Sequence, residues 1–93
     1  MRVTVRIPGP LRPYARDERS VEVDRGPGHV GGVLERLFDR HPALRDRVLT
    51  EQGELRPHVN VFVGSESIRH AGGLHTSVPE GAEITILPAV SGG

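Results

Sequence analysis

The stretch Glu83-Ile84-Thr85-Ile86-Leu87-Pro88 decides how this chain folds, and Ala89-Val90-Ser91-Gly92-Gly93 follows it. Apolar and polar residues alternate over 83–87, which is typical of a half-buried β-strand. Pro88 has a fixed φ and no N–H, so we expect it to end the strand ladder and to set the direction of the residues behind it. The sequence therefore predicts a folded domain over residues 1–87 and a flexible tail over residues 88–93.

Three more strands are predicted upstream from the same period of two. They cover residues 2–7, 20–24 and 58–63, and the first two form an antiparallel pair. We expect a turn at 64–67 and a short edge strand that begins at Ile68-Arg69. Leu11 and Tyr14, in the connection between the first two strands, are expected to make a small satellite contact.

One amphipathic helix is predicted between the second and third strands. Its apolar face follows the i, i+3, i+4, i+7, i+8 spacing in Val30, Val33, Leu34, Leu37 and Phe38. Pro42 ends this helix, and one or two further helical turns are expected over 43–53. Gly31 and Gly32 are expected to let the helix approach the sheet closely.

This order of elements predicts an α+β fold, the β-grasp or ubiquitin-like arrangement. The first and last strands pair in parallel at the centre of a mixed four- to five-stranded sheet, and the main helix covers one face. A domain of this length buries one modest core. We therefore expect a monomer without a self-contained active site of several residues.

Composition excludes several classes of function. The formal net charge is zero with interspersed signs, so neither nucleic acid nor a membrane is an expected partner. The N-terminal residues form no continuous apolar segment, and the expected location is the cytoplasm. The chain has no cysteine, which excludes a disulfide or an iron–sulfur cluster. All twelve basic residues are arginine, so no lysine amine is present to attack an activated carboxyl group.

Two patterns in the sequence suggest sites that we do not expect to exist. Residues 26–31 match the G-x-G-x-x-G dinucleotide motif, but no strand directly follows the helix, and a turn with close helix packing is the better interpretation. The five histidines form no helical pair or ligand cluster, so no metal site is predicted.

Strand parity predicts a docking surface on the open face of the sheet. If Val61 and Ile86 face the helix, then Phe62 and Leu87 face away from it on neighbouring strands. A pair of exposed apolar side chains next to the tail favours a partner surface. Single exposed apolar residues are otherwise ordinary.

The tail has the properties of a segment that enters another protein. Six residues span at most about 20 Å, and Gly92 and Gly93 lack a Cβ, so they can pass through a narrow channel. A terminal carboxylate is a poor electrophile and must be activated before it transfers a group. The alternative is an inert, frayed terminus.

The ending, residues 84–93, resembles the C-terminus of the ubiquitin-like sulfur carriers of the MoaD/ThiS family. That family pattern is an apolar strand, a proline or small residue, a valine, a small residue and a terminal Gly-Gly. Segments 59–63 and 69–78 look most similar to the CysO branch, used in actinobacterial cysteine synthesis.

The resemblance implies a mechanism in which Gly93 bears the sulfur. An E1-like enzyme of the MoeB/ThiF type would use ATP to adenylate the Gly93 carboxylate, and a sulfur donor would replace AMP to leave a thiocarboxylate. Gly92 and Ser91 would line a partner's channel, while Val90, Leu87 and Phe62 would dock. The acceptor would be a cysteine synthase, a thiosugar synthase or a similar enzyme. In the CysO branch a metalloprotease is a further partner.

The resemblance also implies that this chain binds no cofactor of its own. Three alternatives stay open from the sequence. The chain could be a small subunit of molybdopterin synthase, a protein modifier conjugated through Gly93, or an interaction domain with an inert tail.

Overall fold

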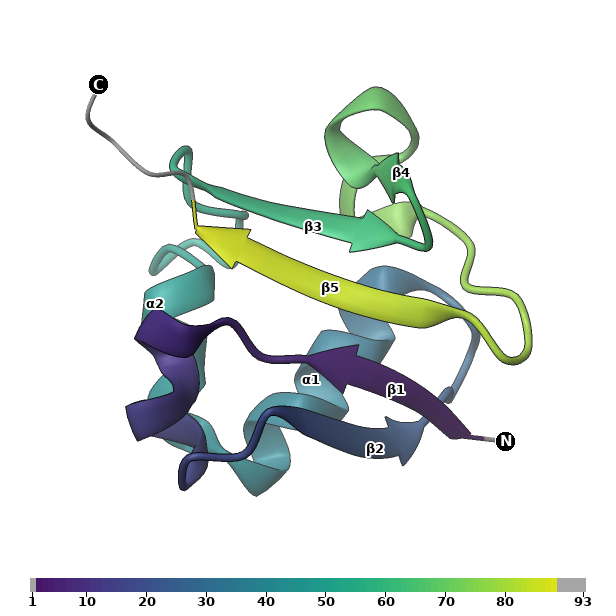
Figure 1. Ribbon diagram of the computed structural model, residues 1–93. Coiled ribbons are helices and arrows are strands. Elements are labelled where there is room, and N and C mark those ends of the chain that lie inside the picture. The colour runs from purple at the N-terminus through teal and green to yellow at the C-terminus, as the bar shows by residue number, and fades with distance from the viewer. Residues whose placement is uncertain (1, 89–93) are drawn as a thin grey trace.

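The computed structural model describes residues 2–88 and shows a mixed five-stranded sheet in the order β2-β1-β5-β3-β4 (Figure 1). The strands are β1 (Arg2–Arg6), β2 (Ser20–Asp24), β3 (Val59–Val63), β4 (Glu66–Ser67) and β5 (Glu83–Pro88). β5 pairs in parallel with β1 and antiparallel with β3. This central position of the last strand confirms the predicted β-grasp topology.

The helix α1 (Val30–Arg40) packs on one face of this sheet, as its apolar period predicts (Figure 1). The fully buried core joins helix residues Val33, Leu34 and Leu37 to Ile84 and Ile86 of β5. Every second residue of β1, β2 and β5 is buried, so one face of the sheet forms the core floor. The hydrophobic effect over this single layer of contacts dominates the stability of the fold.

The connections close the core at its edges. The helix η1 (Gly9–Ala15) follows β1 and buries Leu11 and Ala15, so this segment is part of the main core rather than a satellite of it. After α1, η2 (Pro42–Leu44) and α2 (Arg45–Val48) bury Leu44 and Val48. These are the one or two helical turns that the sequence predicts over 43–53.

The predicted edge strand at Ile68-Arg69 is wrong. β4 lies at Glu66–Ser67, directly after a tight turn at Gly64-Ser65, where Gly64 has a φ of +59°. Ile68 begins the helix η3 (Ile68–His70) and is fully buried. Only glycine adopts this positive φ at low cost, and the turn reverses the chain two residues earlier than predicted.

The expected role of Gly31 and Gly32 also needs correction. A Cβ on Gly31 would approach the Leu74 carbonyl oxygen, and one on Gly32 would approach Pro27. These two glycines therefore allow neighbouring loops, and not the sheet, to pack closely against α1. Leu74 belongs to η4 (Gly73–His75). Pro88 is the last residue of β5, opposite Val59, so the ladder ends at this proline as predicted.

Candidate functional site at the end of β5

The end of β5 presents apolar side chains on the face of the sheet opposite α1. Leu87 is 45% exposed, whereas its neighbour Ile86 is fully buried. Phe62 of β3 is half-buried and pairs with Thr85, so it lies diagonally across from Leu87. The predicted parity is confirmed, because Phe62 and Leu87 share the open face on neighbouring strands. We call these two side chains the open-face pair.

The surroundings of the open-face pair are polar and ordered. Asn60 lies opposite Leu87, and its Oδ1 accepts hydrogen bonds from Ser67 Oγ and the Val61 N–H, both at 2.9 Å. Nearer the start of β5, Arg6 and Glu83 form a half-exposed ion pair at 3.1 Å. The open face is therefore apolar where β5 ends and charged where it begins.

The predicted tail residues Val90, Ser91, Gly92 and Gly93 lie outside the described residues. Their roles, and the docking role of Leu87 and Phe62, stay predictions. The structure shows where the tail leaves the folded domain: the last strand pair is Val59 with Pro88, where β3 begins and β5 ends. Residues 89–93 follow directly from that point in the chain.

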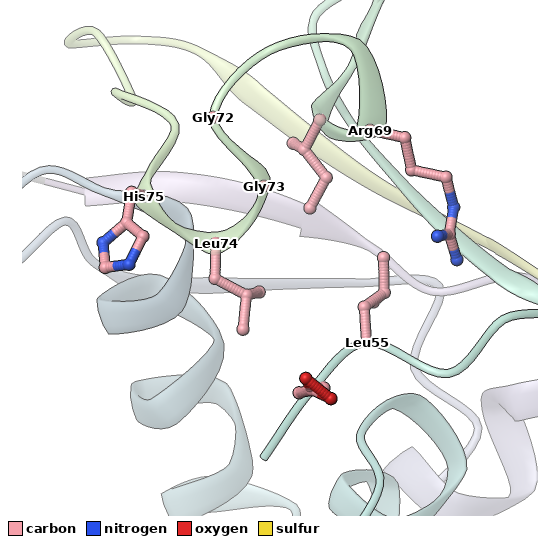
Figure 2. A pocket seen from close by; sticks show the side chains of 8 residues that line it. Leu55, Arg69, Gly72, Gly73, Leu74 and His75 are labelled. Atoms are coloured by element: carbon pink, nitrogen blue, oxygen red, sulfur yellow. The ribbon is translucent and has the colours of Figure 1, made fainter. Parts of the chain in front are cut away.

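A hollow of about 450 Å³ lies elsewhere on the molecule, between η3, η4 and the segment before β3 (Figure 2). Leu55 and Leu74 point into it from opposite sides, while the side chains of Arg69 and His75 point away from it (Figure 2). The Arg69 guanidinium donates to the carbonyl oxygens of Arg56, Pro57 and Val59, so it acts as a structural clamp. An active site needs convergent polar groups in its pocket, and this hollow lacks them among the residues described.

The glycine motif forms a turn, as predicted. Gly26 and Gly28 have φ values of +61° and +94°, which glycine adopts readily. The segment after η4 then covers the N-terminus of α1, because Val30 N–H donates to Thr76 O and Val78 N–H donates to Gly28 O. A dinucleotide phosphate would need those N–H groups free.

The titratable groups give little support for catalysis. Across residues 2–88, no group of three or more His, Asp or Glu side chains is arranged to hold a metal ion. The pKa of Asp24 is held below its ordinary value, chiefly because its carboxylate accepts a hydrogen bond from the Gly26 N–H at 2.7 Å. Asp24 is exposed at the end of β2, so this shift reflects a local turn contact.

The sequence analysis missed one group of residues at the tail end of the sheet. Asp46 and Arg47 of α2 and Arg56 and His58 before β3 line a polar hollow there. No strand or helix pattern in the sequence places any of these four residues next to the tail. The arginine-rich composition of 45–58 was a visible signal, but only the fold brings this segment to the end of β5.

Comparison with known proteins places these features in a family. The model of the ThiS family matches residues 5–93. The sulfur carrier protein CysO of Mycobacterium tuberculosis is 37% identical over 95 residues, which covers all of both chains. The small archaeal modifier protein 1 of Haloferax volcanii is 41% identical over 76 residues, covering 81% of this chain and 83% of the relative.

Solved structures agree with the sequence relatives. A chain in the crystal structure of the Amycolatopsis orientalis BexX/CysO complex superposes with a TM-score of 0.88 at 38% identity, covering 98% of this chain and 99% of that one. The CysO crystal structure from M. tuberculosis gives a TM-score of 0.85 at 36% identity, covering 95% and 99%. None of the helices within residues 2–88 is long and apolar enough to cross a bilayer.

Proposed function

The chain belongs to the ThiS family, and from this premise we propose that it is a sulfur carrier that bears a thiocarboxylate on Gly93. The observation that carries the proposal is the extent of the match. The family model runs from residue 5 through Gly93 and so includes the closing Gly92-Gly93 as well as the β-grasp body.

The first step is activation of the Gly93 carboxylate. An E1-like enzyme of the MoeB/ThiF type binds ATP, and the carboxylate attacks the α-phosphorus to give an acyl adenylate and pyrophosphate. A sulfur nucleophile then displaces AMP, which leaves the thiocarboxylate. ATP binds to the activating enzyme, and this chain holds no cofactor of its own.

The second step is delivery of sulfur to a biosynthetic enzyme in the cytoplasm. Gly92 and Ser91 follow the channel of that enzyme, while Val90, Leu87 and Phe62 contact its surface. The similarity to CysO favours cysteine synthase as the acceptor, followed by a metalloprotease that releases the product. A thiosugar synthase or a similar enzyme is the alternative acceptor.

The folded domain supports this role through the position of its last strand and through the apolar side chains on its open face. β5 is the central strand of the sheet and its last residues pair with β3, so the tail departs from a strand that the sheet holds in place. Leu87 and Phe62 offer apolar contact area immediately upstream of it. The absence of lysine leaves no side-chain amine in this chain to capture the activated acyl group.

A second candidate function is supported by the archaeal relative. Because the chain is 41% identical to a small archaeal modifier protein over 76 residues, conjugation through Gly93 to lysines of other proteins is the alternative. It shares the activation step and differs only in the final acceptor.

Intact mass spectrometry of the protein isolated from its host tests the proposal. A sulfur carrier shows a species heavier by the replacement of one oxygen with one sulfur. A variant that lacks Gly93 shows none, although its circular dichroism is unchanged. A ladder of heavier protein adducts without the sulfur species would instead establish the modifier, and an unmodified mass in every growth condition would overturn both.

A further inference from the structure

The polar hollow lies at the same end of the sheet as the last residue of β5. It has a volume of about 210 Å³, and Asp46, Arg47, Arg56 and His58 line it. His58 directly precedes Val59, and Val59 is the strand partner of Pro88. Figure 1 shows α2 and the start of β3 beside the end of β5. The hollow therefore flanks the point from which the tail departs.

The backbone around the hollow is firmly held. Arg56 N–H donates to Val48 O at 3.0 Å and its Nε donates to Asp46 O at 2.7 Å, which ties the segment before β3 to α2. The Arg56 carbonyl oxygen accepts from Val59 N–H and from the Arg69 guanidinium. A site fixed in this way loses little conformational entropy when a partner binds.

The charge of the hollow is positive and not neutralised within the described chain. Over residues 2–88, no carboxylate oxygen forms an ion pair with Arg47 or Arg56. The Asp46 side chain is 82% exposed and its only ion pair there, at 3.5 Å, is with Arg45. The Arg47 guanidinium stacks over the Tyr14 ring at 4.3 Å, which orders it without cancelling its charge.

Two other features of residues 2–88 are weaker candidates for a docking site. The Arg6–Glu83 pair on the open face is internally compensated. The larger hollow at Leu55 and Leu74 lies between η3, η4 and the segment before β3, and its arginine, Arg69, already donates from Nη2 to three backbone carbonyl oxygens. Arginine forms bidentate hydrogen bonds with carboxylates, so two accessible guanidinium groups favour an acidic partner.

We propose that the hollow of Arg47, Arg56 and His58 docks carboxylate side chains of the activating enzyme, beside the channel that admits the tail. This inference rests on the proposed function. It adds a charged contact to the apolar contact of Leu87 and Phe62, on the other flank of the tail. Charge pairs of this kind guide association and orient the partner, so their removal weakens binding and lowers its dependence on salt.

The test compares two charge-reversed forms of the full chain. Arg47→Glu with His58→Glu changes the hollow, and neither side chain donates a hydrogen bond in residues 2–88. Arg2→Glu with His75→Glu is the matched control, with the same charge change on exposed residues away from the end of β5. Steady-state sulfur loading by the host's MoeB/ThiF-type enzyme is measured at low and moderate salt.

The hollow variant should raise KM for the carrier by about tenfold or more, with kcat within about twofold, and its KM should lose most of its salt dependence. The control should stay within about twofold of wild type. Circular dichroism and urea unfolding check the fold, and Arg56→Gln supplies a second variant that removes charge without reversing it. If wild type and the hollow variant share one KM, the docking inference is overturned while the carrier function stands. If wild type gains no sulfur at all, both fail.

Discussion

The two faces of β5 differ sharply in burial. Ile86 points to α1 and is fully buried, while the next residue, Leu87, points to the open face and is 45% exposed. Both are large aliphatic residues on one strand, one residue apart. Ile86 therefore contributes to folding and Leu87 is available to a partner, because the buried face of β5 packs within the chain and Leu87 stays exposed among residues 2–88.

The largest expected effect comes from truncating each of these two residues in turn. Ile86→Ala should lower the free energy of unfolding by about 2–5 kcal/mol, because it leaves a cavity beneath α1. Leu87→Ala should change it by no more than about 0.5 kcal/mol, as is usual for exposed positions. Urea unfolding monitored by circular dichroism measures both.

The order of the two effects should be reversed when partner binding is measured, with the larger effect at Leu87 and the smaller one at Ile86. Leu87→Asp places a charge in the proposed apolar contact, and we expect KM for sulfur loading to rise about tenfold, the equivalent of about 1.4 kcal/mol. Ile86→Val, which keeps the core nearly filled, serves as the control and should load like wild type. A loss of stability from Leu87→Ala as large as that from Ile86→Ala would contradict the comparison.

Patterns local to one element predicted most of the fold. The period of two in residues 83–87 and the helical spacing from Val30 to Phe38 each appear in the structure as predicted, because burial on one face imposes a period on the sequence. Their order along the chain was then sufficient for the sheet topology.

The incorrect or missing predictions concern segments whose structure depends on tertiary contacts. Ile68 is of a residue type that is common in strands. The turn at Gly64-Ser65 nevertheless places β4 before it, and Ile68 is buried in η3. Arg47 and Arg56 were missed because they are nine positions apart in irregular sequence and meet only through the packing of α2 against the segment before β3. The role of Gly93 stays a prediction from the resemblance and the tail's composition, whereas the hollow near the end of β5 could be found only from the fold.

A smaller change in the free energy of unfolding is expected from replacing His41, whose side chain has a buried polar atom. His41, at the end of α1, is 7% exposed, and its Nε2 has no hydrogen-bond partner among the described residues. A buried polar atom without a partner lowers stability, and an apolar group of similar size removes that cost. His41→Leu should therefore raise the free energy of unfolding, by up to about 1 kcal/mol.

Urea unfolding at neutral pH measures this change, with the exposed His75→Leu as control. The control should stay within about 0.5 kcal/mol of wild type. A loss of more than about 1 kcal/mol in His41→Leu would show that the imidazole makes a favourable contact that the described residues do not reveal.

The smallest effect is expected at the charged end of the sheet, farthest from the tail. The hydrogen bond from Gly26 N–H holds the pKa of Asp24 below its ordinary value in the folded chain. Between the folded and unfolded pKa values the unfolded state binds more protons, so this contribution is present above the unfolded pKa and disappears as the pH falls through the folded one. Asp24→Asn keeps the acceptor oxygen but removes the titration. Its stability in urea should therefore fall less steeply than that of wild type in the acid range. Equal slopes in wild type and Asp24→Asn would show that this turn contact carries no pH dependence.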